Sequence, residues 1–100
     1  MLLYNTTYSI ELGNEEDFLA WMKETHLPEV MATELPLEHK MLQLLTEVDN
    51  GAATFSVQYI FNNPRKLETF RNTYLDSFKE KIDDRYRGKY VFFESLLKEV

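Results

Sequence analysis

His26 is the side chain of this sequence best suited to proton chemistry. It lies between Trp21, the only tryptophan, and the helix-breaking Pro28. An imidazole titrates near pH ~6.5, so a well-placed histidine can act as a general acid or base. His26 is therefore the candidate catalytic residue. Two structural alternatives stay open: the ring could donate to backbone carbonyls freed by Pro28, or it could fill space beside Trp21.

Three further side chains are candidates for binding a ligand together with His26. Trp21 offers an aromatic face, and the amides of Asn5 and Gln58 offer a donor and an acceptor each. This uncharged set suits a neutral or weakly anionic molecule, aromatic or haem-like, between the helices and the sheet near Trp21, His26 and Asn5. The alternatives are core packing for Trp21 and a dimer seam for the amides.

The composition argues against several other functions. A net charge of −6 disfavours nucleic acid and anionic membranes as partners, because both need a basic surface. We expect no signal peptide and no membrane span, and the absence of cysteine fits a cytoplasmic protein. The sequence has two histidines, no acidic cluster with ligand spacing and no glycine-rich phosphate loop. We therefore expect neither a metal nor another cofactor.

The N-terminal third predicts a strand followed by a helix. Polar and apolar residues alternate over 2–12, which is the period of a strand. Asn14 is placed to cap a helix, and Pro28 should end or kink that helix near His26, with Leu27 outside the helical region and a short turn over 29–32. The apolar stripe of this helix is predicted to be Phe18, Trp21, Met22 and Thr25.

The rest of the sequence predicts three strands and one helix. The strands are expected over 38–48, 53–62 and 89–97, with a hairpin turn at Asp49-Asn50-Gly51. The helix is opened by Asn63-Pro64 and stopped by Gly88. Its predicted apolar stripe is Leu67, Phe70, Tyr74, Phe78 and Ile82. The order βαββαβ predicts one α+β domain over 1–100, with a ferredoxin-like antiparallel sheet and both helices on one face.

The second face of this sheet should be covered by a second copy of the chain. Residues 1–10, 41–46 and 52–61 contain no charged side chain, although a solvated face normally carries several. The second and fourth strands are apolar on both sides, a pattern typical of strands covered on both faces. The sequence therefore predicts a homodimer through the sheet face. The alternative is a monomer with an open polar face.

The segment from Trp21 to Thr33 carries a family resemblance. It reads W-M-K-E-T-H-L-P-E-V-M-A-T and resembles the W-M-K-E-x-H-h-P-E-V-M-x-T signature of a small bacterial family of unknown function. That family is similar to the dimeric α/β-barrel proteins that include antibiotic-biosynthesis-type monooxygenases. The resemblance implies the ferredoxin-like fold and the barrel dimer.

The resemblance leaves three functions open. In cofactor-free oxygenases and haem-degrading relatives of that superfamily, a Trp, an Asn and a His can line the cavity, and Asn5, Trp21 and His26 are the same residue types. The protein could be a homodimer that binds a small molecule. It could instead be a non-catalytic structural or interaction dimer, or a cofactor-free monooxygenase-like enzyme.

Overall fold

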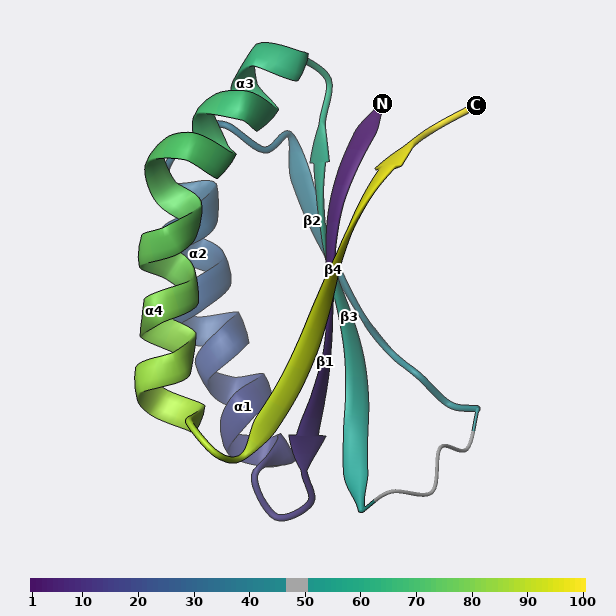
Figure 1. Ribbon diagram of the computed structural model, residues 1–100, viewed down its shortest axis with the longest axis vertical. Helices are drawn as coiled ribbons and strands as arrows, with labels where there is room; N and C mark the ends of the chain where they lie inside the picture. Colours follow the sequence, from purple (N-terminus) through teal and green to yellow (C-terminus); the bar gives the residue numbers. More distant parts are fainter. Residues whose placement is uncertain (47–50) are drawn as a thin grey trace.

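A four-stranded antiparallel sheet with helices on one face forms the fold in the computed structural model, which describes residues 1–46 and 51–100 (Figure 1). The strands are β1 (Leu2–Glu11), β2 (Glu38–Gln43), β3 (Ala52–Phe61) and β4 (Tyr90–Lys98). They lie in the order β2-β3-β1-β4, and every neighbouring pair is antiparallel. This is the ferredoxin-like arrangement that the order of the elements predicts.

Strand β2 is shorter than predicted. It ends at Gln43, whereas the sequence predicted a strand through residue 48. Leu44 still donates a backbone hydrogen bond to Thr54 (2.8 Å), but Leu45 is 88% exposed and outside the strand. The predicted strand residues 47 and 48 and the predicted turn residues 49 and 50 lie outside the described residues. Gly51, the last residue of that turn, has a φ of +70°, a conformation that favours glycine.

The first helix does not end near His26. It runs through α1 (Glu15–Trp21), a π-helical turn η1 (Met22–His26) and α2 (Leu27–Met31). Leu27 is helical, with φ −60° and ψ −43°, and its N–H donates to the carbonyl of Met22 five residues earlier. The wider π turn leaves room for the ring of Pro28 at the start of α2, where a missing N–H matters little. The predicted break at Pro28, with a turn over 29–32, is therefore wrong.

The π turn also changes which residues the helix buries. Phe18, Met22, His26 and Val30 are buried at steps of four, because a π turn takes more residues than an α turn. The predicted stripe is wrong at Thr25, which is exposed. The second helix is built in the same way, from α3 (Pro64–Thr69), η2 (Phe70–Tyr74) and α4 (Leu75–Tyr86).

The predicted start and stop signals of the second helix act as expected, whereas the predicted cap of the first helix does not. The side chain of Asn63 accepts a hydrogen bond from the N–H of Arg65 (2.8 Å), and Pro64 is the first residue of α3. Gly88 follows the end of α4 with a φ of +80°. Asn14 precedes α1, but its side chain does not cap the helix; its amide donates instead to the Glu11 carbonyl (3.5 Å).

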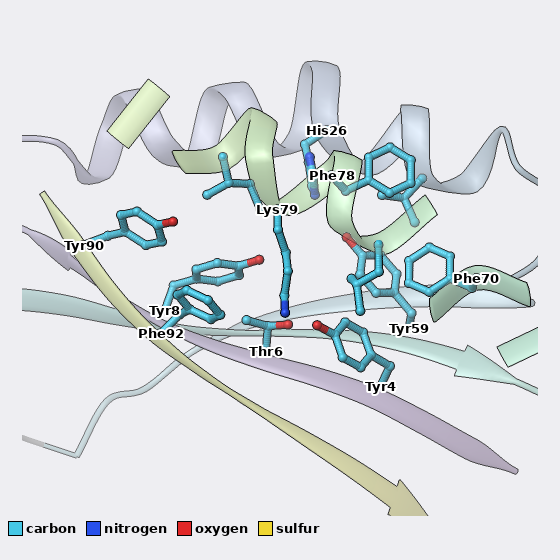
Figure 2. Close-up of a pocket in the computed structure, with 13 residues that line it drawn as sticks. Tyr4, Thr6, Tyr8, His26, Tyr59, Phe70, Phe78, Lys79, Tyr90 and Phe92 are labelled. Atoms are coloured by element: carbon cyan, nitrogen blue, oxygen red, sulfur yellow. The ribbon is translucent and has the colours of Figure 1, made fainter. Parts of the chain in front are cut away.

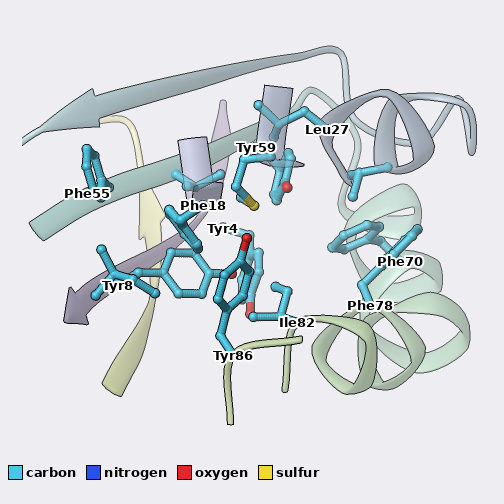
Figure 3. Packing of buried hydrophobic residues seen from close by; sticks show 14 of the residues in the cluster. Tyr4, Tyr8, Phe18, Leu27, Phe55, Tyr59, Phe70, Phe78, Ile82 and Tyr86 are labelled. Carbon is cyan, nitrogen blue, oxygen red and sulfur yellow. The ribbon is translucent and has the colours of Figure 1, made fainter. Parts of the chain in front are cut away.

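The core between helices and sheet is dominated by aromatic rings (Figure 3). The Phe18 ring is fully buried, and its centroid lies 5.4 Å from those of Tyr8 and Tyr86 and 5.8 Å from that of Phe55. Burying one such side chain stabilises a fold by roughly 1.5–3 kcal/mol. Within residues 1–46 and 51–100, no helix has the length and apolar character needed to cross a membrane.

Candidate functional site

A small cavity lies between the helices and the covered face of the sheet (Figure 2). Side chains alternate between the two faces of a strand, so Tyr4 and Tyr8 of β1 and Tyr59 of β3 all point toward the helices. His26 reaches the cavity from η1, and Lys79 from α4. The polar side chains in the wall are Tyr4, Thr6, Tyr8, His26, Tyr59, Lys79 and Tyr90.

Two polar atoms in this wall have no hydrogen-bond partner. They are Nδ1 of His26 and the hydroxyl of Tyr59, and among the described residues they are the only buried side-chain polar atoms in that condition. The two residues are 3% and 4% exposed. An unpaired buried polar group destabilises a fold by roughly 1–3 kcal/mol, and such groups normally find a partner in the protein or in water. The cavity wall therefore has hydrogen-bonding capacity at two points that the chain itself does not satisfy.

The histidine and three of the tyrosines in the cavity wall are held in their neutral forms. Burial lowers the pKa of His26 to about 4, so the imidazole is uncharged at pH 7. Burial also raises the pKa of the Tyr8 and Tyr59 hydroxyls above 10.0, and it raises that of Tyr90 to about 12. These groups can donate or accept hydrogen bonds at neutral pH. They are poorly matched to proton transfer, which favours a group whose pKa lies near the working pH.

An ion pair closes the cavity on the side of β4. Nζ of Lys79 lies 2.7 Å from one carboxylate oxygen of Glu94, and the hydroxyl of Tyr4 donates to the other. Lys79 also lies over the ring of Phe92, 5.7 Å from its centroid. In Figure 2 the Lys79 side chain extends from α4 across the opening toward Thr6. We call this ion pair the cover; the side chains of Lys79 and Glu94 are 36% and 30% exposed.

The cover separates a very small interior space from a much larger groove. The interior cavity has a volume of about 20 Å3, and the outer groove about 500 Å3. Tyr4, Leu75 and Lys79 line both. A volume of ~10–15 Å3 holds one water, whereas ligand pockets span ~300–1,000 Å3. The interior therefore has room for about one water molecule, and of these two spaces only the groove has the size of a ligand site.

Trp21 supports His26 from behind and does not line the cavity. The two rings stack with centroids 5.0 Å apart, which confirms the interpretation that His26 fills space beside Trp21. No hydrogen bond joins the imidazole to the carbonyls near Pro28 in the described part of the chain, so the capping alternative is wrong. The guanidinium of Arg85 also lies over the ring of Trp21, 5.6 Å from its centroid.

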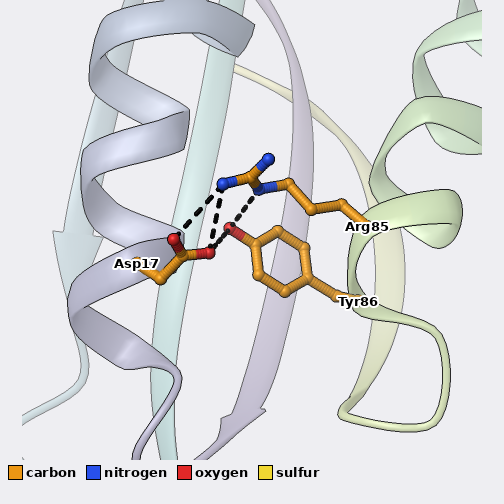
Figure 4. Close-up of polar contacts among 3 residues, drawn as sticks. All are labelled: Asp17, Arg85 and Tyr86. Carbon is orange, nitrogen blue, oxygen red and sulfur yellow. Dashed lines mark hydrogen bonds and ion pairs between the residues drawn. The ribbon is translucent and has the colours of Figure 1, made fainter.

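A polar cluster between the helices consists of Asp17, Arg85 and Tyr86 (Figure 4). Asp17 of α1 accepts hydrogen bonds from the Tyr86 hydroxyl (2.9 Å) and from Arg85 (3.2 Å), both on α4. Tyr86 also meets Trp21 edge to face, with centroids 5.8 Å apart. The cluster thus links the two helices, and two of its members, Arg85 and Tyr86, also contact Trp21.

Asn5 and Gln58 lie on the opposite face of the sheet from His26. They are cross-strand partners in β1 and β3, between residues whose side chains face the helices. Because neighbouring side chains in a strand point to opposite faces, Asn5 cannot share a cavity with Tyr4 and His26. The structure therefore does not assemble the predicted group of Asn5, Trp21, His26 and Gln58. Only His26 lines the cavity.

The open face of the sheet carries a hydrogen-bonded stripe of neutral side chains. Ser56 donates to the Asn5 side chain (2.5 Å), Asn5 donates to Thr7 (3.3 Å), and Ser9 and Thr54 are 3.1 Å apart. Exposed apolar side chains flank this stripe on the edge strands. They are Leu42 on β2 and Val91, Phe93 and Leu97 on β4.

The sequence reasoning missed the residues at the cavity mouth. Neither Lys79 nor Glu94 belongs to a motif with a recognisable function. One signal was available: Glu94 is the only charged residue in the stretch 90–97. Its register partner Thr6 places it on the covered face of the sheet, where a carboxylate needs a partner. Across residues 1–46 and 51–100, no three His, Asp or Glu side chains form a group suited to a metal ion.

A family model and solved structures match the whole chain. The model of a domain of unknown function, DUF4286, matches residues 1–100. A dimeric ferredoxin-like protein from an uncultured marine organism has a TM-score of 0.75 at 16% identity, covering 99% of this chain and 97% of that one. No curated protein matches the sequence.

Two further structures illustrate the range of proteins with this fold. An ethyl tert-butyl ether d (ethd) family protein from Bacillus halodurans has a TM-score of 0.69 at 13% identity, with 100% of both chains covered. A candidate antibiotic biosynthesis monooxygenase from Deinococcus radiodurans has a TM-score of 0.69 at 12% identity, covering 100% of this chain and 93% of that one. At such identities the likeness extends to the fold alone.

Proposed function

The chain belongs to the DUF4286 family, and on that premise we propose that it is a homodimer in which each protomer binds a small neutral or weakly anionic aromatic molecule between its helices and its sheet. The proposed location is the cytoplasm, and the absence of cysteine is consistent with that reducing compartment. The proposal has two parts, assembly and binding, which rest on opposite faces of the sheet.

The open face supports the homodimer. Val91 and Phe93 on one edge strand are 69% and 62% exposed, and Leu42 on the other edge is 47% exposed. Between these edges, the Asn5–Ser56 stripe is polar but uncharged, so a second sheet can cover it without burying an ion. A stable interface of this kind buries ~1,200–2,000 Å2 in total. The marine neighbour of the same fold is itself described as dimeric.

One observation carries the binding proposal: Nδ1 of His26 and the hydroxyl of Tyr59 are buried without partners in the wall of the same cavity. A ligand that enters from the outer groove past Lys79 would supply the missing partners. Its ring would lie among Tyr4, Tyr8 and Phe92, which favours an aromatic molecule. Because His26 is neutral, the inserted end of the ligand should be neutral too.

Binding is better supported than catalysis. A cofactor-free monooxygenase-like enzyme needs a base that takes a proton from its substrate, and the pKa of His26 at about 4 makes that ring a weak base. A non-catalytic structural dimer is the second candidate function, and the observation in its favour is the small interior volume of about 20 Å3. The two candidates differ in whether Lys79 moves aside for a ligand.

Native mass spectrometry of protein purified from its own source tests both parts. We expect a dimer that retains a small molecule. Thermal-shift measurements with flavins, haem and quinones follow, and we expect His26→Ala and Tyr59→Phe to weaken any stabilising compound. Tyr74→Phe is the matched control, because Tyr74 is 37% exposed and does not line the cavity. A dimer without retained molecule or stabilising compound would favour the structural dimer, and a monomer would contradict the assembly.

A further inference from the structure

The hydrogen bonds around Glu94 describe a site for a carboxylate. One oxygen of Glu94 accepts from the hydroxyl of Tyr4, and the other accepts from Nζ of Lys79 at 2.7 Å. Tyr4 is 3% exposed, so its hydroxyl is a buried donor fixed by the packing of β1. Charged hydrogen bonds to a carboxylate are among the stronger contacts in proteins. The donors of this site come from β1 and α4, and the chain itself supplies the anion from β4.

A second cation lies in the same groove with no partner of its own. Arg71 of η2 lines the groove together with Tyr4, Lys79 and Glu94. Within the described residues, Arg71 has neither a side-chain hydrogen bond nor an ion pair. Burial alone would raise the pKa of Glu94, but the hydrogen bonds from Lys79 and Tyr4 and the positive charges of Lys79 and Arg71 lower it overall. Asp76 lines the groove too, so two cations and two carboxylates face each other there.

We infer that Tyr4, Lys79 and Arg71 form an anion subsite for the carboxylate of an aromatic ligand, and that the side chain of Glu94 occupies this subsite until a ligand displaces it. The inference rests on the proposed binding function and names the class of ligand: an aromatic carboxylic acid with a neutral polar group at its far end. Its carboxylate replaces that of Glu94, and its ring passes the mouth toward His26 and Tyr59.

The surroundings of Glu94 allow this exchange. The Glu94 side chain is 30% exposed and belongs to an edge strand, so it can turn into solvent without breaking the sheet. Phe92 and Leu96 share its face of β4 and are 42% and 49% exposed. The displaced carboxylate would therefore leave an opening with apolar sides, two cations and the single remaining carboxylate of Asp76. The groove volume of about 500 Å3 suits a single-ring acid.

The experiment compares 4-hydroxybenzoate with its neutral analogue 4-hydroxybenzamide, by NMR titration of the intact protein. We expect Arg71→Met and Lys79→Met each to weaken 4-hydroxybenzoate binding by ~10-fold or more, as loss of a charged hydrogen bond does. Glu94→Gln should strengthen it by a similar factor, because the competing carboxylate is gone. Binding of 4-hydroxybenzamide should change less than ~3-fold in the Arg71→Met variant.

Matched controls remove the same charges elsewhere. Arg65→Met, Lys23→Met and Glu68→Gln alter exposed side chains away from the groove, and we expect wild-type binding of both probes. Weaker binding of 4-hydroxybenzoate by Glu94→Gln would overturn the subsite. An affinity for 4-hydroxybenzoate that neither Arg71→Met nor Lys79→Met changes would overturn it too. If 4-hydroxybenzamide still binds in a way that needs His26, the proposed function survives that failure. Absence of 4-hydroxybenzoate binding by both wild type and Glu94→Gln would also overturn the subsite.

Discussion

The two faces of the sheet are built from the same strands but differ in how far their apolar side chains are buried. On the face toward the helices, Tyr4, Tyr8 and Ile10 of β1 are each at most 6% exposed, within a continuous aromatic core. On the opposite face, Asn5 and Thr7 make hydrogen bonds along the sheet, while Phe93 beside them is 62% exposed. The apolar side chains of the covered face are buried within one protomer. On the open face, apolar side chains of the edge strands stay exposed, and a second copy of the chain can cover them.

This difference separates stability from assembly. Substitutions on the covered face act on the folding of the protomer, because the packing there involves one chain. Substitutions on the open face should act mainly on association. The polar atoms show the reverse pattern: the stripe on the open face is hydrogen-bonded, whereas His26 and Tyr59 on the covered side are not. The covered face is thus complete for packing but incomplete for hydrogen bonding, which is why we place the ligand there.

The largest expected effect comes from removing a ring on the covered face. Phe18→Ala should lower the free energy of unfolding by about 3–5 kcal/mol, because Phe18 is fully buried against three other rings. Phe93→Ala removes the same ring from the open face and should weaken only the dimer. In urea denaturation, the deficit of Phe93→Ala should vanish on dilution, and that of Phe18→Ala should not. Deficits with the same concentration dependence would contradict the comparison.

The next largest effect tests the open face directly. Thr7 and Ser56 are cross-strand partners near the centre of that face. Thr7→Glu or Ser56→Arg would bury an unpaired charge at the interface, at a free-energy cost of ~3–5 kcal/mol. The dissociation constant of the dimer should then rise by at least ~100-fold in sedimentation velocity. Glu16→Arg, on the exposed side of α1, is the control and should remain dimeric.

A pH dependence sharpens the description of the covered side. Burial lowers the pKa of His26 from 6.5 to about 4, and Glu29 and Lys81 act on it in opposite directions. Between these values the unfolded chain binds more protons than the folded chain, so the free energy of unfolding rises with pH and levels off above 6.5. The total contribution is roughly 3 kcal/mol, at ~1.4 kcal/mol per pKa unit.

His26→Phe should remove this pH dependence while keeping a ring for Trp21 to stack on. The measurement is thermal or urea unfolding of both proteins between pH 4 and 7. The difference in unfolding free energy between wild type and His26→Phe should change across that range. The control His39→Gln alters an exposed histidine, and its difference in unfolding free energy from wild type should be the same at every pH. A difference that is constant with pH would show that His26 titrates normally in the folded protein.

The smallest effect concerns the helix pair above the cavity. Tyr86→Phe keeps the buried ring and removes the hydroxyl, which donates to Asp17 and accepts from Nε of Arg85. We expect a loss of about 1 kcal/mol in the free energy of unfolding, measured by urea denaturation. Tyr74→Phe, at a more exposed position with no side-chain hydrogen bond in the described residues, should lose less. A loss from Tyr86→Phe as large as that from Phe18→Ala would mean that the polar cluster, and not the aromatic core, sets stability.

The order of the elements, the faces of the strands and the uncharged stripe at the centre of the open face could all be predicted from the sequence. Alternation with a period of two assigns Tyr4 and Asn5 to opposite faces wherever the strand lies, since the pleat allows nothing else. Asn63 and Gly88 act through their own backbone neighbours, so their roles were also readable locally. These features depend on residues close together along the chain.

Only the tertiary structure decided how the helix passes Pro28 and what surrounds His26. A π turn, with hydrogen bonds five residues apart, is rare in helices. Here it occurs where the helix packs on the core and buries Met22, His26 and Val30 together. The mouth joins Tyr4, Lys79 and Glu94 from three elements, and no local pattern encodes their distances. The unpaired atoms of His26 and Tyr59 arise in the same way, because a missing partner is a property of the space between elements and not of either segment.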